Sequence, residues 1–357
     1  MHNAKSVLSF RISLKFITVI AVLFFGFYAW ILTTWKHTNK LKYKFTQKLH
    51  ASRQLTPTAN CSSETPFSLK DSNTLTNFNL NIPQRFIVDI EKANDQNLQG
   101  SVPDLAKTEF DFVQRPDKKF CNYDVEILVL VKSSLEHNEL RNIIRQTWGS
   151  IRNVSGVQVR TAFLIGMTSN STLLRDVTNE TRTFGDVILG SYYDTYKNLT
   201  VKALMGLKWN HLYCRSSFFL LADDDAFINL RKIAQDYAIV RSPKSNEIQC
   251  GHILARHAKV LRRGKWAVSP EIYDLPYYPP YCWGPCFIMS KDVAEKIYLT
   301  SCHTHSDFAI DDVFVSGVLR EKIGVSLGRM PKGSCLYLDN KNSDIKAKFL
   351  SEWKKIL

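Results

Sequence analysis

Several common sequence signatures are missing from this chain of 357 residues. It contains no internal repeat, no P-loop and no GxGxxG fingerprint. Zinc-knuckle spacing, an RNA-binding aromatic signature and a basic heptad region are absent as well. The net charge is nevertheless +14, which suits an anionic ligand, a membrane surface or nucleic acid. Because the nucleic-acid motifs are missing, nucleic acid is the weakest of these three partners.

Charge itself is absent from residues 16–35. Twenty such residues, rising about 1.5 Å each, are enough for one helical membrane span. A cleaved signal peptide would end in small residues, whereas Trp30, Trp35 and Lys36 stand here. The pattern therefore predicts a cytoplasmic tail at residues 1–15 and an uncleaved anchor at residues 16–35.

Two kinds of evidence disagree on the orientation of this anchor. Five lysines between residues 36 and 48 would place the C-terminal part in the cytosol by the positive-inside rule. Eight cysteines follow the span, and an even cysteine count suits an oxidising lumen. Five glycosylation sequons follow it too, at Asn60, Asn153, Asn170, Asn179 and Asn198. We therefore expect a lumenal C-terminal part.

Beyond the anchor the chain changes character near Cys121. Residues 36–120 are rich in Ser, Thr, Asn and Gln without a sustained period, which predicts a stem. In the domain expected at residues 121–357, apolar runs alternate with helical patterns. We predict strands at 125–131, 161–165, 186–189 and 218–222 and helices at 140–148, 170–184, 199–213 and 230–240. This alternation predicts an α/β domain with a mostly parallel central sheet.

The most informative stretch is the apolar run 218–222, which is followed at once by Asp223, Asp224 and Asp225. Adjacent like charges raise one another's pKa, so the triplet favours a cation or hydrogen-bond donors beside it. Ligands bind at the carboxyl ends of strands in open α/β sheets. In an extended backbone Asp223 and Asp225 point to one side, and their oxygens suit Mg²⁺ or Mn²⁺. The alternative is a solvated turn or a helix cap.

A basic face is predicted on the helix at residues 140–148. Arg141, Arg145 and Trp148 fall on that face, where two guanidinium groups beside an indole could hold a phosphate or stack on a base. The alternative is an ordinary surface face with Trp148 in the core.

Two later segments are candidates for acceptor chemistry. Asp311 and Asp312 open a predicted helix, and one of them could act as a general base, although helix N-termini favour acidic residues in any case. The aromatic and proline-rich segment 265–286 suits sugar rings or, equally, a loop packed on the core.

These features, in this order, resemble the inverting β-1,3-glycosyltransferase family of the Golgi, which includes galactosyl- and N-acetylglucosaminyltransferases and is related to Fringe. The resemblance covers roughly residues 125–324. Five blocks carry it: RNIIRQTWG from Arg141, FLIG from Phe163, DTYKNLTVK from Asp194, the aspartate triplet, and YYPPYCWG followed by DDVFV from Asp311.

The resemblance implies a GT-A-type nucleotide-sugar-binding fold, a UDP-sugar donor and Mn²⁺. It places the metal at Asp225, with Asp223 as a second candidate ligand, and the catalytic base at Asp312 beside Asp311. The candidate nucleotide-binding residues are Arg141, Arg145, Trp148, Lys202, Asp223 and Asp224. Because an aspartate at a helix start has no evident reason for a raised pKa, we expect proton transfer to be concerted with attack.

The implied function is inverting transfer of a hexose in β-1,3 linkage to a glycan acceptor on a glycoprotein or glycolipid. Galactose is the first candidate sugar and N-acetylglucosamine the second. The implied location is the Golgi membrane, as a type II protein with a lumenal catalytic domain at residues 121–357. A glycan-binding or chaperone-like relative without turnover is the alternative, and a basic adhesion or nucleic-acid-binding protein is a third.

The chain departs from the family pattern at three places. No histidine follows His305, where the family has a metal-binding one, and Asp339 or Asn340 occupies that neighbourhood. Pro285 and Cys286 replace paired glycines, which suggests a local Cys282–Cys286 disulfide. Asp311 stands where glutamate is commoner. These departures motivate the alternative without turnover.

Overall fold

The computed structural model describes residues 110–121, 125–239, 246–254, 258–304, 307–338 and 344–357. The predicted anchor, the stem up to residue 109, the sequon at Asn60 and the pair Asp339 and Asn340 lie outside these ranges. Within the described ranges, no helix is both long enough and apolar enough to cross a membrane.

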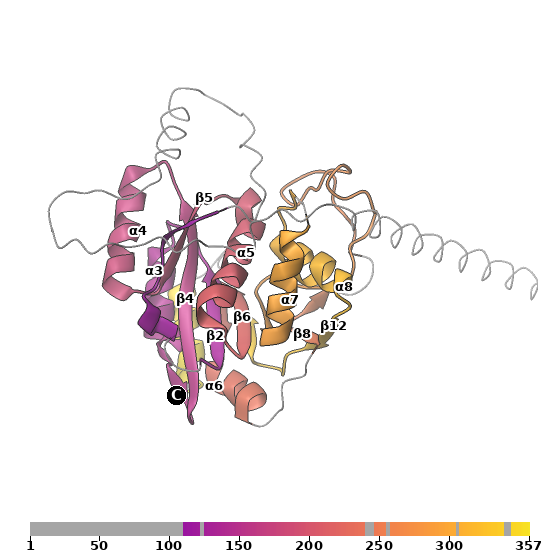
Figure 1. The fold of residues 1–357 in the computed structure, drawn as a ribbon. Coiled ribbons are helices and arrows are strands. Elements are labelled where there is room, and N and C mark those ends of the chain that lie inside the picture. The colour runs from indigo at the N-terminus through magenta and orange to yellow at the C-terminus, as the bar shows by residue number, and fades with distance from the viewer. Residues whose placement is uncertain (1–109, 122–124, 240–245, 255–257, 305–306, 339–343) are drawn as a thin grey trace, which may run out of the picture. The chain divides into compact units, whose positions relative to one another are not determined.

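A nine-stranded mixed sheet forms the centre of the described part of the chain (Figure 1). Eight of its strands follow one another in the order β1 (Phe112–Gln114), β5 (Val187–Tyr193), β4 (Val157–Met167), β2 (Ile127–Lys132), β6 (Phe218–Asp223), β11 (Cys286–Ser290), β8 (Glu247–Cys250) and β12 (Ser326–Arg329). The ninth, β3 (Asn153–Val154), pairs with β4.

The sheet has a parallel half and a half with antiparallel pairings. Strands β5, β4, β2 and β6 run parallel to one another. Strand β11 is antiparallel to both β6 and β8. The predicted alternation of strands and helices is thus confirmed for the first half, whereas the aromatic segment leads into antiparallel pairing. Two small antiparallel pairs complete the strands: β9 (Ile253–Leu254) with β10 (Tyr281–Cys282), and β7 (Ala226–Ile228) with β13 (Cys335–Tyr337).

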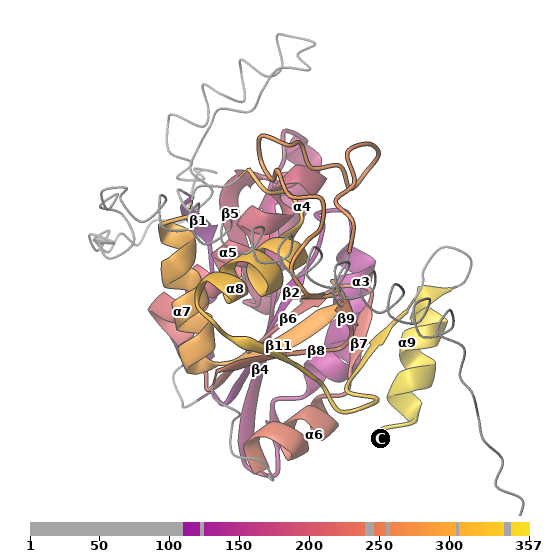
Figure 2. The ribbon, with the colours of Figure 1, turned by 90° about the vertical axis from the view of Figure 1, so that its right-hand side faces the viewer.

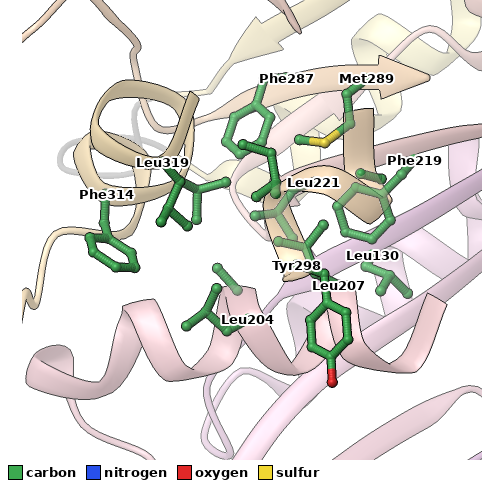
Figure 3. Close-up of a cluster of buried hydrophobic side chains, with 14 of the residues drawn as sticks. Leu130, Leu204, Leu207, Phe219, Leu221, Phe287, Met289, Tyr298, Phe314 and Leu319 are labelled. Atoms are coloured by element: carbon green, nitrogen blue, oxygen red, sulfur yellow. The ribbon is translucent and has the colours of Figure 1, made fainter. Parts of the chain in front are cut away.

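Two hydrophobic cores cover the two faces of the sheet. Strand β2 is buried throughout, and its alternate residues divide between them: Leu128 and Leu130 join one core, Ile127 and Val129 the other. The first core contains Leu204 and other residues of α5 (Leu199–Trp209), and residues of α7 (Lys291–Cys302) and of the π-helical segment Val313–Leu319 (Figure 3). The second contains residues of α3 (Asn138–Gln146), α4 (Ser171–Phe184), α6 (Leu230–Ile233) and α9 (Ile345–Lys354). Truncating a leucine to alanine in such a core costs about 2–5 kcal/mol.

Local signals set the boundaries of α3 and α4, and the end of α3 differs from the sequence prediction. Helix α4 begins where the Asn170 side chain accepts hydrogen bonds from two backbone amides, and it ends at Gly185 in the left-handed conformation. Helix α3 ends at Gln146, because Thr147 leaves the helical region at φ −116° and ψ −124°. Trp148 therefore starts a separate 3₁₀ turn, Trp148–Ser150, instead of completing the predicted helix.

Within the described ranges, three disulfides join distant segments: Cys121–Cys214, Cys250–Cys282 and Cys286–Cys335. The predicted Cys282–Cys286 bond is therefore wrong. The physical reason is that the two cysteines end up in different strands. Cys282 lies in β10, paired with β9, whereas Cys286 begins β11 and pairs with Ala222 of β6.

Candidate active site

A buried lysine holds two of the predicted site aspartates together. Lys132 and Asp223 end the parallel strands β2 and β6 at the same register. The Lys132 ammonium lies 2.8 Å from Asp223 Oδ1 and 2.6 Å from Asp311 Oδ2. Burial lowers the pKa of Lys132, but the negative charges of Asp223 and Asp311 outweigh this and raise it above its usual range. Lys132 is therefore positively charged, and its two ion pairs join Asp223 of the triplet to Asp311.

Asp224 turns toward the segment between β2 and α3. Its Oδ2 accepts a hydrogen bond of 2.7 Å from the Ser133 hydroxyl and lies 2.8 Å from His137 Nδ1. The hydrogen bond to Asp224 raises the pKa of His137, although burial opposes this. The same Ser133 hydroxyl accepts a hydrogen bond from Arg141. Asp224 thus connects the strand end to the start of α3.

Asp225 is the aspartate of the triplet with an unmet need for a positive partner. Its Oδ1 is buried, and none of the described residues provides a hydrogen bond to that atom. Burial, followed by the charges of Asp223 and Asp224, raises the pKa of Asp225 to about 7. A divalent cation would stabilise the ionised form, so this carboxylate fits the predicted metal.

The described part of the chain supplies only part of a coordination shell. It contains no group of three or more His, Cys, Asp or Glu side chains arranged to hold a metal ion. Mg²⁺ and similar hard cations are commonly held by one or two carboxylates together with substrate phosphates. Asp225, with Asp223 as its neighbour, fits that arrangement.

Asp312 lies close to Gly284, as Asp223 of the triplet does. A Cβ at Gly284 would be 3.5 Å from Asp223 Oδ2 and 3.5 Å from Asp312 Oδ2, so the two carboxylates border the same small space. Asp312 is 8% exposed, and its Oδ1 accepts a hydrogen bond of 2.7 Å from the Val313 amide. Burial, with the charge of Asp311 next, raises the pKa of Asp312 to about 7. The expectation that this helix-start aspartate lacks a reason for a raised pKa is therefore wrong.

Lys202 lies where three parallel strands end. Its ammonium contacts Asp194 at 2.7 and 3.0 Å and donates a hydrogen bond to the Ser133 carbonyl. Asp194 Oδ2 in turn accepts from the Gly166 amide at 2.9 Å. A side chain at Gly166 would collide with the Tyr192 carbonyl, only 2.7 Å away, so this close approach requires glycine. Lys202 therefore holds the ends of β2, β4 and β5, and its contact with a nucleotide stays a prediction.

The predicted basic face of α3 lies inside the protein. Arg141 is fully buried and forms a two-point ion pair with Glu180 of α4, with N–O distances of 2.8 and 2.7 Å. Arg145 contacts Asp186 at 2.8 and 2.7 Å and Glu180 at 2.8 Å. Trp148 is fully buried in the second core, as the alternative interpretation of this face supposed. Their contact with a nucleotide stays a prediction, but these partners show what the arginines do in the protein by itself.

An aromatic pair borders the acidic residues. The Tyr196 ring lies 5.0 Å from that of Trp266, and the Lys265 ammonium lies 4.6 Å from the Tyr196 ring centre. Burial, then the charges of Asp311 and Asp312, raise the pKa of Tyr196. Its hydroxyl is buried, and no hydrogen bond to it comes from the described ranges. This aromatic pair brings part of the segment 265–286 close to the acidic residues.

The four sequons in the described ranges differ in exposure. Asn153, Asn170 and Asn179 are exposed. Asn198 is half-buried, and its side-chain amide donates a hydrogen bond of 2.9 Å to the Tyr193 carbonyl.

Sequence reasoning missed three residues of this site. Lys132 and Ser133 follow an apolar run, 127–131, that signals only a buried strand. The available signal was a lysine directly after one apolar run and three aspartates directly after another. If the two strands are parallel neighbours, these charges meet at the same edge of the sheet. Gly284 was noted only as part of a block, although carboxylate oxygens of both Asp223 and Asp312 lie close to it.

Comparison with known proteins gives a family match and curated relatives. The family described as Galactosyltransferase matches residues 139–331. Beta-1,3-galactosyltransferase 5 of Gorilla gorilla gorilla is 33% identical over 225 residues, which are 62% of this chain and 74% of that protein. Beta-1,3-galactosyltransferase 1 of Mus musculus is 32% identical over 219 residues, 60% of this chain and 66% of that protein.

Solved structures give a weaker match. The mannosyltransferase PcManGT from Pyrobaculum calidifontis, in complex with GDP-Man and Mn²⁺, is 12% identical and covers 72% of this chain and 66% of its own, with a TM-score of 0.34. This similarity is too low to bear on the function.

Proposed function

This chain belongs to the galactosyltransferase family, and we propose that it transfers galactose from UDP-galactose to a glycan hydroxyl in β-1,3 linkage, with inversion. Membership of the family confirms the predicted enzyme class. The β-1,3 linkage and the choice of galactose before N-acetylglucosamine are supported by the names of the relatives. A GT-A-type fold is part of the same proposal, and the mixed sheet with its parallel half is compatible with it.

The observation that carries the proposal is that the buried Asp312 and Asp223 border the same small space at Gly284. A general base works best with a pKa near the operating pH, and the pKa of Asp312 is raised to about 7. Asp312 accepts the proton of the acceptor hydroxyl while that hydroxyl oxygen forms a bond to the anomeric carbon. The bond from that carbon to the diphosphate breaks in the same step, and UDP leaves from the opposite face. A single displacement of this kind inverts the anomeric configuration.

The residues at the triplet would hold the diphosphate end of the donor. Asp225, with Asp223, would bind a divalent cation such as Mn²⁺, which when bound neutralises the negative charge of the leaving diphosphate. Lys132 keeps Asp223 and Asp311 in place through its two ion pairs. The ends of the parallel strands β2, β4 and β6 are the expected place for the nucleotide.

We also propose a Golgi membrane location with a lumenal catalytic domain. The disulfides of the described ranges support an oxidising compartment, because such bonds persist there. Three exposed sequons and the uncharged residues 16–35 support the same orientation.

The test is an assay of the full-length protein in detergent with a panel of UDP-sugars and glycan acceptors, with and without Mn²⁺. We expect transfer of galactose that requires Mn²⁺ and a β-anomeric product by NMR. Asp312→Asn should lower kcat by roughly 10²–10⁴-fold, the usual contribution of a general base. Asp307→Asn, an exposed aspartate shortly before the acidic pair, is the matched control and should retain wild-type activity. Full activity of Asp312→Asn would exclude this residue as the base.

A relative without turnover is the second candidate. It is motivated by the sequence, in which no histidine follows His305 and Pro285 and Cys286 replace the paired glycines of the family pattern. Release of UDP that depends on both Mn²⁺ and acceptor would exclude it.

A further inference from the structure

Three aromatic side chains form an exposed cluster beside the active site. The Trp283 ring lies 5.4 Å from that of Tyr337 and 6.1 Å from that of His252, with interplanar angles of 67° and 85°. Trp283 is 40% exposed and Tyr337 is 42% exposed, and His252 is exposed as well. Single exposed aromatics are common on protein surfaces, but here two rings both pack against Trp283 and form a larger cluster with it. We refer to His252, Trp283 and Tyr337 as the aromatic platform.

Two disulfides fix the geometry of the aromatic platform. Trp283 directly follows Cys282, which is bonded to Cys250, and His252 stands two residues after Cys250. The same loop ends at Cys286, which is bonded to Cys335. Tyr337 stands two residues after Cys335, so each neighbour of Trp283 is tied to one end of the loop. The Trp283 amide also donates a 2.9 Å hydrogen bond to the His252 carbonyl. This surface is therefore preorganised.

The aromatic platform adjoins the reacting groups. Gly284 follows Trp283 and lies against Asp223 and Asp312. The Asp223 amide donates a hydrogen bond of 3.0 Å to the Pro285 carbonyl, and the Leu338 amide, next to Tyr337, donates one of 3.0 Å to the Asp225 carbonyl. The backbone close to Trp283 and the backbone next to Tyr337 are thus both hydrogen-bonded to the aspartate triplet.

Its position in the fold points to the acceptor. The loop leads into β11, which is antiparallel to β6 and β8. Tyr337 lies in β13, which pairs with β7, and His252 directly precedes β9; strands β7, β9 and β11 are labelled in Figure 2. A nucleotide binds at the carboxyl ends of parallel strands, which here are those of β2, β4 and β6. The acceptor hydroxyl must instead reach Asp312. Gly284, the residue after Trp283, lies close to the Asp312 carboxylate.

We propose that His252, Trp283 and Tyr337 bind a sugar ring of the acceptor glycan other than the one that reacts. This proposal rests on the proposed function and adds a substrate class, namely acceptors of at least two sugars. The aromatic faces would pack on the C–H face of a sugar, and the His252 imidazole and Tyr337 hydroxyl can form hydrogen bonds to its hydroxyls.

The experiment compares two acceptors that end in the same sugar, p-nitrophenyl N-acetylglucosaminide and the trisaccharide lacto-N-triose, with full-length protein and UDP-galactose. In Trp283→Ala the ratio of kcat/KM for the trisaccharide to that for the monosaccharide should fall roughly tenfold, as expected from loss of an aromatic contact. Trp283→Tyr should restore most of this ratio. Leu299→Ala, which removes a side chain of similar exposure (42%) on α7, should leave the ratio unchanged.

A second readout does not depend on turnover. Saturation-transfer NMR should detect lacto-N-triose on the wild-type protein, and Trp283→Ala should lose that signal while its affinity for UDP is unchanged. An equal fall in kcat/KM for both acceptors, or a loss of UDP affinity, would overturn the platform as an acceptor subsite. Absence of trisaccharide binding to the wild type would overturn it too. Binding that depends on Trp283 without any sugar transfer would support the platform and reject the proposed enzyme activity.

Discussion

At the scale of single residues, the three consecutive aspartates have three different environments. Asp223 is paired with Lys132, and Asp224 with Ser133 and His137, while Asp225 has a buried oxygen that no described residue satisfies. The negative charges of Asp223 and Asp224 are therefore compensated by neighbouring groups, whereas that of Asp225 is not compensated within the described ranges. Only Asp225 is left with a clear need for a cation.

The raised pKa of Asp312 has a direct consequence for the pH dependence of the reaction. The base must be ionised to accept a proton, so kcat/KM should rise tenfold per pH unit below about pH 7 and level off above it. Because the pKa in the folded protein lies above the ordinary value of 3.8, the folded state binds the proton more tightly than the unfolded one. This group therefore lowers the free energy of unfolding as the pH rises from about 4 to about 7.

Asp312→Asn is the control for this pH dependence. The variant should lose the decrease in the free energy of unfolding that Asp312 causes between about pH 4 and about pH 7. Urea titrations of both proteins at several pH values measure this difference. A rate profile that stays flat between pH 5 and pH 8 would exclude a titrating base with this pKa.

At the scale of elements, buried ion pairs connect the helices on one side of the sheet. Arg141 and Arg145 of α3 meet Glu180 of α4, and Arg141 also reaches Ser133, which hydrogen-bonds Asp224. The helix pair is thus coupled to the triplet through a chain of hydrogen bonds. Arg141 of α3 therefore helps to position Asp224 through Ser133, and the contact of both arginines with a nucleotide stays a prediction.

Removing Arg141 should therefore destabilise the domain. Arg141→Ala leaves Glu180 buried beside one arginine instead of two, and losing one partner of a buried pair costs about 3–5 kcal/mol. Arg175→Ala is the matched control, because Arg175 on α4 is 61% exposed and its ion pair with Asp176 spans 3.8 Å. An exposed pair contributes about 0–1 kcal/mol. Similar unfolding midpoints in urea for both variants would contradict a structural role for Arg141.

The same elements show what the sequence could predict. The run 218–222 with its charged end identified a buried strand and the site at its tip, because burial and charge are local patterns. The partners Glu180 and Asp186 lie about forty residues from the arginines, and no local pattern indicates them. Cys286 was paired with the wrong cysteine for the same reason, since pairing depends on the strand to which each cysteine belongs.

At the scale of the whole molecule, the sheet divides the work between its two halves. The parallel half brings Lys132, Ser133 and Asp223 to one edge. The antiparallel half contributes the loop with Gly284, and Asp312 caps the later helical segment Val313–Leu319. The sequence pattern predicted the parallel half well, because helices alternate regularly with strands there. It could not predict how the aromatic loop folds against the triplet, since that depends on two disulfides between distant segments.

The proposed lumenal orientation can be tested by glycan mapping of the chain expressed in a eukaryotic cell. Asn153, Asn170 and Asn179 are exposed, and Asn170 caps α4 through its Oδ1, which leaves its amide nitrogen available for a glycan. Asn198 is half-buried, its amide nitrogen bonds the Tyr193 carbonyl, and a bulky glycan there would lie beside the turn that leads to Lys202.

Replacing each exposed asparagine by glutamine should therefore remove one glycan and increase the electrophoretic mobility by one step. Treating the parent chain with an endoglycosidase should remove all its glycans and abolish these differences in mobility. Asn198→Gln should leave the mobility unchanged. Because glycans are attached only to chain segments inside the secretory lumen, a chain without glycans at any of the four sites would contradict the lumenal placement of this domain. A glycan found at Asn198 would instead show that the turn around it is more open than its hydrogen bond indicates.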